Sequence, residues 1–450
     1  MNKIKNINIK TTIFIITCFL IGLLSINAHT DDYFWHIKLG EIMINQKTIH
    51  PAECFAWTNN IYDINWINHS WLSDIIFYLI YKIFGINFAF IFKLVMCTII
   101  YIVLKNNFNL NTFTRLFSLF YFTIYLQTVS SRPYLFSVLF LILLLFILNK
   151  EKYNIKTYIF AALIFFCWVN MHGSSYLLST CFCLYYMFFS FLQKTKYKDK
   201  IILLLINICM AFTNLFDYKC IFYLFKLNSN TKEYINEWHG IFNGNFSKGT
   251  IISCLIVLLL LYICIKNFKK NKIKENLICF GLIFLSILSY RFIIYAIPVI
   301  MFFNLKYFDK ENFSNKTARI YFYITIGVLI CILSTGFPKI NGIISDDMIN
   351  YIKKENPKNL YNLYDDGSFL IYNNIKVFVD SREQPYINYY LSDVFKAQSE
   401  SDIDITKKLI DTYNFDYILY NEKINFTEID DRYLVVYKDN EKILYKNTFK

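Results

Sequence analysis

The chain has 450 residues, of which 56% are hydrophobic, and it carries 12 glycines, 6 prolines and a formal net charge of +13. Soluble domains are about 45–50% apolar. The excess here lies in blocks of about 16–20 residues with hardly any charge, the length that crosses about 30 Å of hydrocarbon. Because an open segment satisfies its backbone hydrogen bonds in lipid only as a helix, this composition excludes an ordinary soluble enzyme and favours an all-α polytopic transmembrane bundle.

In chain order the pattern predicts eleven membrane spans, at residues 11–28, 86–104, 112–129, 133–148, 157–171, 174–192, 201–216, 250–265, 276–290, 292–305 and 319–337. The first span could also be a signal peptide, because three lysines precede it. Its apolar run is long for the core of a signal peptide, and "LLSINAHTDD" gives only a weak cleavage site. We therefore expect an uncleaved first span.

Lysine and arginine in the short loops set the orientation of the bundle. With the N-terminus in the cytoplasm, the cytoplasmic segments 1–10, 105–115, 149–156, 193–200, 266–274 and 306–319 hold 21 Lys and Arg in 60 residues. An odd number of spans then leaves the C-terminal region outside the cell membrane. The net positive charge reflects this inside bias and attraction to anionic membrane lipids. No basic-aromatic platform indicates a nucleic-acid partner.

Histidine and tryptophan fall on one side of this topology. All of them lie in, or within about a turn of, the predicted outer loops, namely His29, His36, His50, His69, His172, His239, Trp35, Trp57, Trp66, Trp71, Trp168 and Trp238. Tryptophan prefers membrane interfaces, but on both faces, so this preference does not explain the asymmetry. We interpret it as a polar, aromatic-lined site on the outer face.

Arginine is rare, with six residues among the 46 basic ones. Arg132 in "SSRPYLF" and Arg291 in "LSYRFIIYAIP" stand at the outer ends of predicted spans. Arginine is preferred over lysine where a phosphate needs a planar, bidentate partner. The two residues could therefore hold a lipid phosphate, and the competing interpretation is that they reach up to the outer headgroups.

The first outer segment, residues 29–85, begins directly after the first span with Asp31 and Asp32. The stretches "DYFWHIKLGEIMI" and "WLSDIIFYLIYKIF" have apolar residues at helical spacing and predict two helices lying in the interface. The paired carboxylates would then stand at the mouth of the bundle. Such groups are costly near lipid unless they face a polar cavity. One of them could instead cap the following helix, which leaves the other to explain.

Residues 339–450 turn polar and predict a small extracytoplasmic α/β domain, after a transmembrane domain at 1–338. Strands are predicted at 358–364, 376–382, 415–421, 433–439 and 442–447, and amphipathic helices at 346–356, 387–398 and 404–414. "DDGS" and "VDSR" could bind an acceptor or a sugar through Asp365, Asp366, Asp380 and Arg382. The alternative is a turn at "DDG" and a structural Asp380–Arg382 pair.

The motifs of this chain, taken in their order along the sequence and on the outer side of the predicted topology, resemble those of the GT-C superfamily of membrane glycosyltransferases. They are similar to a group of bacterial GT-C-like proteins through "DDYFWHIKLG", "NHSWLSDIIFYLIYKIFG", "SRP" at 131–133, "NMHG" at 170–173, "NEW" at 236–238, "SYRF" at 289–292, "DGSFLI" at 366–371 and "VFVDSR" at 377–382. The resemblance covers nearly the whole chain, although no single motif is specific. Fold-level analogy does not fix function.

The resemblance implies transfer of a sugar from a polyprenyl-phosphate carrier to an acceptor on the outer face. An outer-loop carboxylate, Asp32 or Asp31, would accept the proton of the acceptor hydroxyl. Positive or polar side chains would hold the departing lipid phosphate, namely Arg132, Arg291 and His172. The sugar and acceptor would be bound by His36, Glu41, His69, Trp71, Asp380 and Arg382. Some members use a divalent metal and others do not, so the resemblance leaves Mg²⁺ or Mn²⁺ open as a cofactor.

Three other functions compete with the transferase. A transporter should show internal repeats or helices broken by glycine or proline at mid-membrane. The sequence shows no repeat and little glycine, and Pro298 is the only proline well inside a predicted span, which argues against transport. An O-antigen ligase or polymerase also uses lipid-linked sugars, but its main outer loop lies late in the chain. A non-catalytic scaffold of the same fold should tolerate removal of Asp31 and Asp32. The sequence names neither the sugar nor the acceptor, and it leaves the oligomeric state open.

Overall fold

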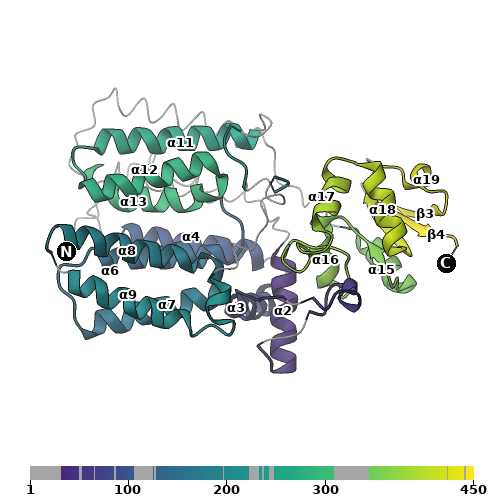
Figure 1. Ribbon diagram of the computed structural model, residues 1–450, viewed down its shortest axis with the longest axis horizontal. Coiled ribbons are helices and arrows are strands. Elements are labelled where there is room, and N and C mark those ends of the chain that lie inside the picture. The colour runs from purple at the N-terminus through teal and green to yellow at the C-terminus, as the bar shows by residue number, and fades with distance from the viewer. Residues whose placement is uncertain are drawn as a thin grey trace, which may run out of the picture.

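A computed structural model describes residues 32–49, 53–64, 66–85, 88–105, 125, 128–195, 197–221, 233–235, 238–242, 248–308, 344–422, 424–439 and 442–449. Two bodies are visible in Figure 1, a bundle of long helices and a smaller α/β domain. Helix α2 (Tyr33–Gln46) stands between them, across the direction of the bundle helices. The position of this helix decides where the two bodies meet.

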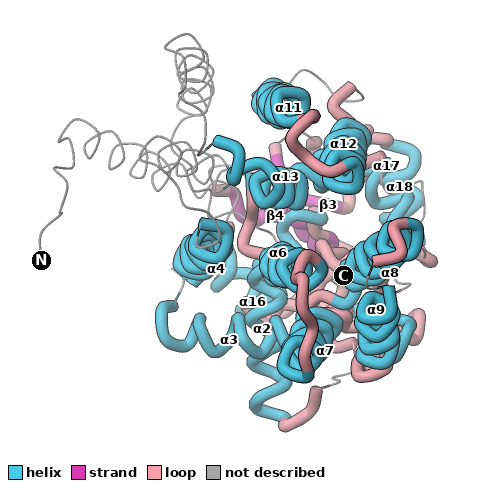
Figure 2. The backbone as a smooth tube through the Cα atoms, turned by 90° about the vertical axis from the view of Figure 1, so that its left-hand side faces the viewer, coloured by secondary structure: helices cyan, strands magenta, loops and turns pink. Residues whose placement is uncertain are grey.

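The bundle is formed in the described part of the chain by helices that run side by side, seen end-on in Figure 2. They are α4 (Phe88–Lys105), α6 (Tyr134–Leu148), α7 (Ile155–Met171), α8 (Tyr176–Leu192), α9 (Tyr197–Ala211), α11 (Lys248–Asn267), α12 (Ile273–Leu288) and α13 (Ile293–Phe308). Short 3₁₀ turns precede α8 and α13, at Gly173–Ser175 and Tyr290–Phe292. Helix α6 is apolar all round and almost wholly buried, so it forms the axis of the bundle.

These helices confirm eight of the predicted helical segments. They are the segment 86–104 and the seven consecutive segments that begin with 133–148 and end with 292–305. The segments 11–28, 112–129 and 319–337 lie wholly or mostly outside the described residues. Two helical stretches, Gly173–Leu192 and Thr250–Asn267, are long and apolar enough to cross a membrane. Shorter apolar helices are Ile91–Leu104, Tyr134–Leu148, Ile155–Met171 and Tyr290–Asn304.

The two helices predicted in the first outer segment are present as α2 and α3 (Trp71–Phe84). They pack closely because Gly40 brings the α2 backbone onto α3. A Cβ atom added at Gly40 would lie 2.1 Å from the Asp74 carbonyl oxygen, far inside van der Waals contact. The glycine of the "WHIKLG" motif therefore sets the distance between the two helices.

The C-terminal domain has a four-stranded sheet with helices packed against it. The strands are β1 (Leu360–Tyr361), β2 (Tyr417–Asn421), β3 (Tyr433–Lys438) and β4 (Lys442–Asn447), in the order β1-β2-β4-β3. Strand β1 is parallel to β2, and the other neighbours are antiparallel. The helices are α15 (Asp346–Glu355), α16 (Gly367–Tyr372), α17 (Leu391–Ser399), α18 (Ile403–Tyr413) and α19 (Phe426–Ile429). Side chains of Ser345 and Asp402 cap α15 and α18.

One local prediction in this domain is wrong. Residues 376–382 do not form a strand of the sheet; Val377 instead makes an isolated parallel bridge with Ala56 of the outer segment. This contact with the N-terminal outer segment replaces the strand that the pattern favoured. The turn considered at "DDG" is a 3₁₀ turn at Tyr364–Asp366 that runs directly into α16.

The outer segment shares its hydrophobic core with the C-terminal domain. Trp57 packs among Phe378, Tyr413 and Phe415, and its indole N–H donates to the Leu360 carbonyl at 3.0 Å. From α2, the Trp35 backbone N–H donates to Ser368 Oγ at 3.1 Å. The two segments are thus one packed unit above the bundle. A division of the chain at residue 339 stays a prediction, since residues 309–343 are not among those described.

The glycine contact gives a first prediction. Substitution Gly40→Ala should lower the stability of the protein by about 1–3 kcal/mol, the usual cost of overpacking a tight contact. Thermal unfolding of the purified protein measures the effect. The matched control is Gly281→Ala in α12, where an added Cβ meets nothing within 4 Å and alanine is the better helix former. Equal melting temperatures for wild type and Gly40→Ala would contradict the close-packing account.

Candidate functional site

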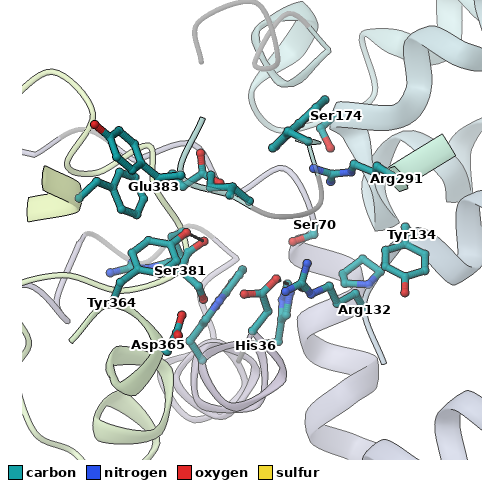
Figure 3. A pocket seen from close by; sticks show the side chains of 18 of the residues that line it. His36, Ser70, Arg132, Tyr134, Ser174, Arg291, Tyr364, Asp365, Ser381 and Glu383 are labelled. Atoms are coloured by element: carbon teal, nitrogen blue, oxygen red, sulfur yellow. Dashed lines mark hydrogen bonds and ion pairs between the residues drawn. The ribbon is translucent and has the colours of Figure 1, made fainter. Parts of the chain in front are cut away.

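A cavity of about 950 Å³ lies where the bundle, the outer segment and the C-terminal domain meet. Figure 3 shows Arg132, Arg291 and Ser174 on one side, and Tyr364, Asp365 and Glu383 on the other. Its volume is at the upper end of the range for small-molecule sites. Predicted site residues that line it are Asp32, His36, His69, Arg132, His172, Arg291 and Arg382.

Asp32 stands at the N-cap of α2 without making a side-chain cap hydrogen bond. Its Oδ2 atom lies 2.8 Å from Arg132 Nε. Its Oδ1 atom is buried and has no hydrogen-bond partner among the described residues. A carboxylate oxygen in this position is costly to desolvate, so it favours a ligand that donates a hydrogen bond there. Asp31 lies outside the described residues.

His36 follows Asp32 by one helical turn and is 3% exposed, so both side chains share one face of α2. The His36 Nδ1 atom is 2.5 Å from Asp74 Oδ1, and Asn68 Nδ2 donates to the other oxygen of Asp74 at 2.7 Å. Burial raises the pKa of Asp74, while His36 and the hydrogen bonds lower it. The carboxylate fixes the orientation of the imidazole ring at the cavity wall.

His69 and His172 lie together at the bundle side of the cavity, with ring centroids 6.0 Å apart. The Gly173 backbone N–H donates to the His69 carbonyl at 2.8 Å, and His172 Nδ1 is 2.8 Å from Ser137 Oγ. Burial lowers the pKa of His69 to about 3, aided by the nearby charges of His36 and Arg291. The pKa of His172 is lowered well below its usual value for the same reasons. Both rings are therefore neutral near pH 7.

Arg291 reaches the same side of the cavity from the turn that begins α13. Its guanidinium carbon lies 4.8 Å from the centre of the Trp238 ring, a cation–π geometry. The neighbouring backbone is fixed by hydrogen bonds from Ile241 N–H to the Ile287 carbonyl and from Tyr290 N–H to the His239 carbonyl. Trp238 and Arg291, about 50 residues apart in the sequence, thus meet at one point of the cavity.

Arg382 is bound between two buried carboxylates. Its Nη1 atom is 2.5 Å from Glu53 Oε2, and its Nη2 atom is 2.6 Å from Asp380 Oδ2. The guanidinium also lies over the Trp66 ring, 4.8 Å from its centre. Burial lowers the pKa of Arg382, but Asp380 and Glu53 outweigh it and hold the pKa well above its usual value. The side chain therefore joins the outer segment to the C-terminal domain at the cavity wall.

Four predicted residues do not line the cavity. One is Asp366, whose carboxylate accepts hydrogen bonds from Lys442 Nζ at 2.6 Å and 2.7 Å, and the other three are Glu41, Trp71 and Asp380. Glu41 pairs with Lys38 Nζ at 2.6 Å on α2. The Trp71 indole N–H donates to Asn170 Oδ1 at 2.9 Å, which links the "HSWL" and "NMHG" motifs behind the cavity. Asp380 lies behind Arg382 and is fully buried. A direct role for Glu41, Trp71 and Asp380 in binding sugar stays a prediction. Their positions are better suited to holding the wall of the cavity in place.

The sequence interpretation missed Asp74, Glu53 and Glu383. Asp74 could have been found, because a carboxylate on the apolar face of the amphipathic helix "WLSDIIFYLIYKIF" calls for a buried partner. Glu53 and Glu383 are ordinary acidic residues in loops, and only the fold brings them to Arg382 and to the cavity. Among the described residues, no three His, Cys, Asp or Glu side chains gather closely enough to hold a metal ion, so no reaction step is assigned to one.

The buried Glu53–Arg382–Asp380 group gives a second prediction. Arg382→Met should destabilise the protein by about 3–5 kcal/mol at pH 8, because it leaves two carboxylates buried without a cation. Protonation removes the uncompensated buried charge of the two carboxylates, so the loss of stability should shrink as the pH falls. Thermal unfolding at pH 5 and pH 8 measures this. The control Arg432→Met breaks a half-exposed pair and should cost no more than about 1 kcal/mol. A loss independent of pH would contradict the assignment.

Comparison with known proteins supports the fold alone. A solved structure of the archaeal oligosaccharyltransferase AglB from Archaeoglobus fulgidus, in complex with an inhibitory peptide and a dolichol-phosphate, matches 92% of this chain and 69% of its own chain. The TM-score is 0.60 and the sequence identity is 10%. No protein-family model matches the chain, and neither does any curated protein sequence. The chain therefore has a fold like that of this oligosaccharyltransferase.

Proposed function

We propose that this chain is a membrane glycosyltransferase of the GT-C type. It transfers a sugar from a polyprenyl-phosphate carrier to an acceptor hydroxyl in the cavity between the bundle and the C-terminal domain. The observation that carries this proposal is the shared cavity, in which Asp32, a carboxylate with one buried oxygen that makes no hydrogen bond among the described residues, lies beside Arg132, and which Arg291 also lines. The GT-C-like fold agrees with the proposal without establishing it.

Exposed apolar side chains on the bundle support its insertion in a membrane. Many large hydrophobic residues on the outer helices are about half exposed, including Leu163, Phe188, Leu205, Leu258 and Phe284. A soluble surface rarely exposes contiguous apolar area on this scale, whereas lipid would cover it. The cavity then opens at the end of the bundle that carries the outer segment. In this proposal the topology is N-in and C-out, as the loop charges favour.

Arg132 and Arg291 would hold the phosphate of the carrier. They stand at the starts of α6 and α13, where the lipid chain could follow the bundle while the phosphate enters the cavity. Charge-assisted hydrogen bonds from guanidinium groups are among the strongest that a phosphate can accept. His69 and His172, kept neutral by burial, can donate or accept hydrogen bonds there without adding charge.

Asp32 would accept the proton of the acceptor. The acceptor oxygen attacks the anomeric carbon of the donor sugar, and the bond from that carbon to the carrier phosphate breaks. The carrier phosphate leaves with the bonding electron pair, stabilised by the two arginines, and the acceptor proton passes to Asp32 Oδ1. Because attack and departure occur on opposite faces, the configuration at the anomeric carbon is inverted. His36, oriented by Asp74, lies one turn further along and would bind the sugar.

The proposal predicts the effect of Asp32→Asn in the native host. Loss of a general base lowers the rate by about 10²–10⁴-fold, so the variant should behave as a deletion does. Both strains should accumulate one lipid-linked sugar and lose one surface glycan, measured by mass spectrometry of lipid and glycan extracts. The identity of the accumulated lipid names the donor.

The matched control is Asp404→Asn, which removes the charge of an exposed aspartate in the first turn of α18 and should leave both extracts as in wild type. Immunoblotting of membranes checks that each variant reaches wild-type amounts. If the deletion alters the glycan while Asp32→Asn does not, Asp32 is not the base. If neither extract changes on deletion, the transferase proposal fails.

A further inference from the structure

The charges that line the cavity are separated by side. Arg132 and Arg291 belong to the bundle side, whereas the C-terminal domain presents Asp365 and Glu383 on the opposite side (Figure 3). Arg382 adds no net positive charge there, because Glu53 and Asp380 both bind it. The cavity thus has one wall with the two arginines, here called the cationic wall, on which Asp32 pairs with Arg132, and one acidic wall that carries Asp365 and Glu383.

The acidic wall presents two carboxylates to the cavity. Asp365 is an exposed side chain that lines it, and desolvation by the surrounding protein raises the pKa of its carboxyl, with Lys442 and Arg132 lowering it and Asp32 raising it. Lys442 is already engaged by Asp366, at 2.6 Å and 2.7 Å. Glu383 has a left-handed backbone, with φ of 56°, a conformation that is unfavourable for a residue with a side chain and that gathers at functional sites.

Hydrogen-bonding and aromatic groups accompany these carboxylates. Trp35 is 5% exposed and lines the cavity, and its indole N–H has no partner among the described residues. Ser381 Oγ is likewise buried without a hydrogen bond in the described part of the chain. Phe395 lies against Tyr364, with ring centroids 5.1 Å apart, and stacks on Tyr234 at 5.3 Å. Buried donors without partners favour a ligand that accepts hydrogen bonds.

We propose that the C-terminal wall is the acceptor subsite, and that it takes a neutral or amino-bearing saccharide and rejects an anionic one. Unpaired donors, carboxylates and aromatic faces together suit sugar hydroxyls and a sugar amine. The cavity of about 950 Å³ leaves room for a sugar phosphate and a short saccharide, not for a folded partner. This inference rests on the proposed function, because it treats the cationic wall as the donor side.

Binding to the purified full-length protein in nanodiscs tests the proposal without turnover. The probes are three disaccharides of matched size: a glucosamine disaccharide, which is cationic, its N-acetylated form, which is neutral, and digalacturonate, which is anionic. We expect the cationic sugar to bind about five- to tenfold tighter than the neutral one, and digalacturonate to bind weakest. The double variant Asp365→Asn with Glu383→Gln should bind all three within about twofold of one another.

The control carries Asp404→Asn with Glu422→Gln, which neutralises two exposed carboxylates that do not line the cavity and should keep the wild-type order. Digalacturonate binding as tightly as the cationic sugar would overturn the proposal. The proposal would also fail if the double variant kept the wild-type order of affinities, or if none of the three sugars bound. Displacement of the sugars by tetralysine, at a concentration lower than that of the sugars, would also overturn it and would indicate a peptide acceptor.

A separate titration with farnesyl phosphate distinguishes this inference from the function on which it rests. Wild type should bind it, and Arg132→Gln with Arg291→Gln should not. If farnesyl phosphate fails to bind while the sugar order holds, the saccharide subsite stands and the transferase proposal fails. If farnesyl phosphate binds and the sugar order is absent, the donor side stands and the acceptor assignment is wrong.

Discussion

The buried contact of Arg382 with Glu53 and Asp380 is the interaction on which the rest of the cavity depends. It binds a loop near the start of the chain to a domain near its end, 329 residues apart along the sequence. An isolated buried charge is strongly unfavourable, so the three groups must remain together. The segment that holds Asp32 and the domain that holds Asp365 are thereby fixed on opposite sides of one space.

The second constraint is the close approach of α2 to α3. Gly40 allows the Asp74 backbone to lie against α2, and the Asp74 side chain then reaches His36. The same helix begins at Asp32, whose partner Arg132 opens the central helix α6. One helix therefore couples the packing of the outer segment to the position of the carboxylate that would act on the acceptor. Stability and chemistry share residues here, so a variant in α2 needs a folding control.

Much of the fold could be predicted from the sequence. Apolar runs predicted the bundle helices, helical spacing predicted α2 and α3, and amphipathic spacing predicted α15 and α18. The one-sided distribution of histidine and tryptophan predicted a polar, aromatic-lined site. His36, His69, His172 and His239 all line it, together with Trp35, Trp66 and Trp238. His29 and His50 lie outside the described residues.

What escaped prediction depends on contacts between distant segments. "VFVDSR" has the pattern of a strand, yet it bridges to Ala56 because the outer segment occupies the place beside it. Trp71 was expected from the resemblance to bind the sugar or the acceptor, yet its indole N–H donates a hydrogen bond to Asn170 Oδ1. Glu383 carries no local pattern at all. The roles of such residues are decided by tertiary contacts between distant segments, and the periodicity or spacing of the local sequence does not predict these contacts.

The central claim is that the carrier phosphate lies in this cavity between Arg132 and Arg291. Cryo-electron microscopy of the protein in nanodiscs, with a polyprenyl phosphate bound, tests it most directly. The account predicts phosphate density within hydrogen-bonding distance of both guanidinium groups, with the lipid chain following α6 and α13. A phosphate bound elsewhere on the protein, with the cavity free of it, would contradict the account.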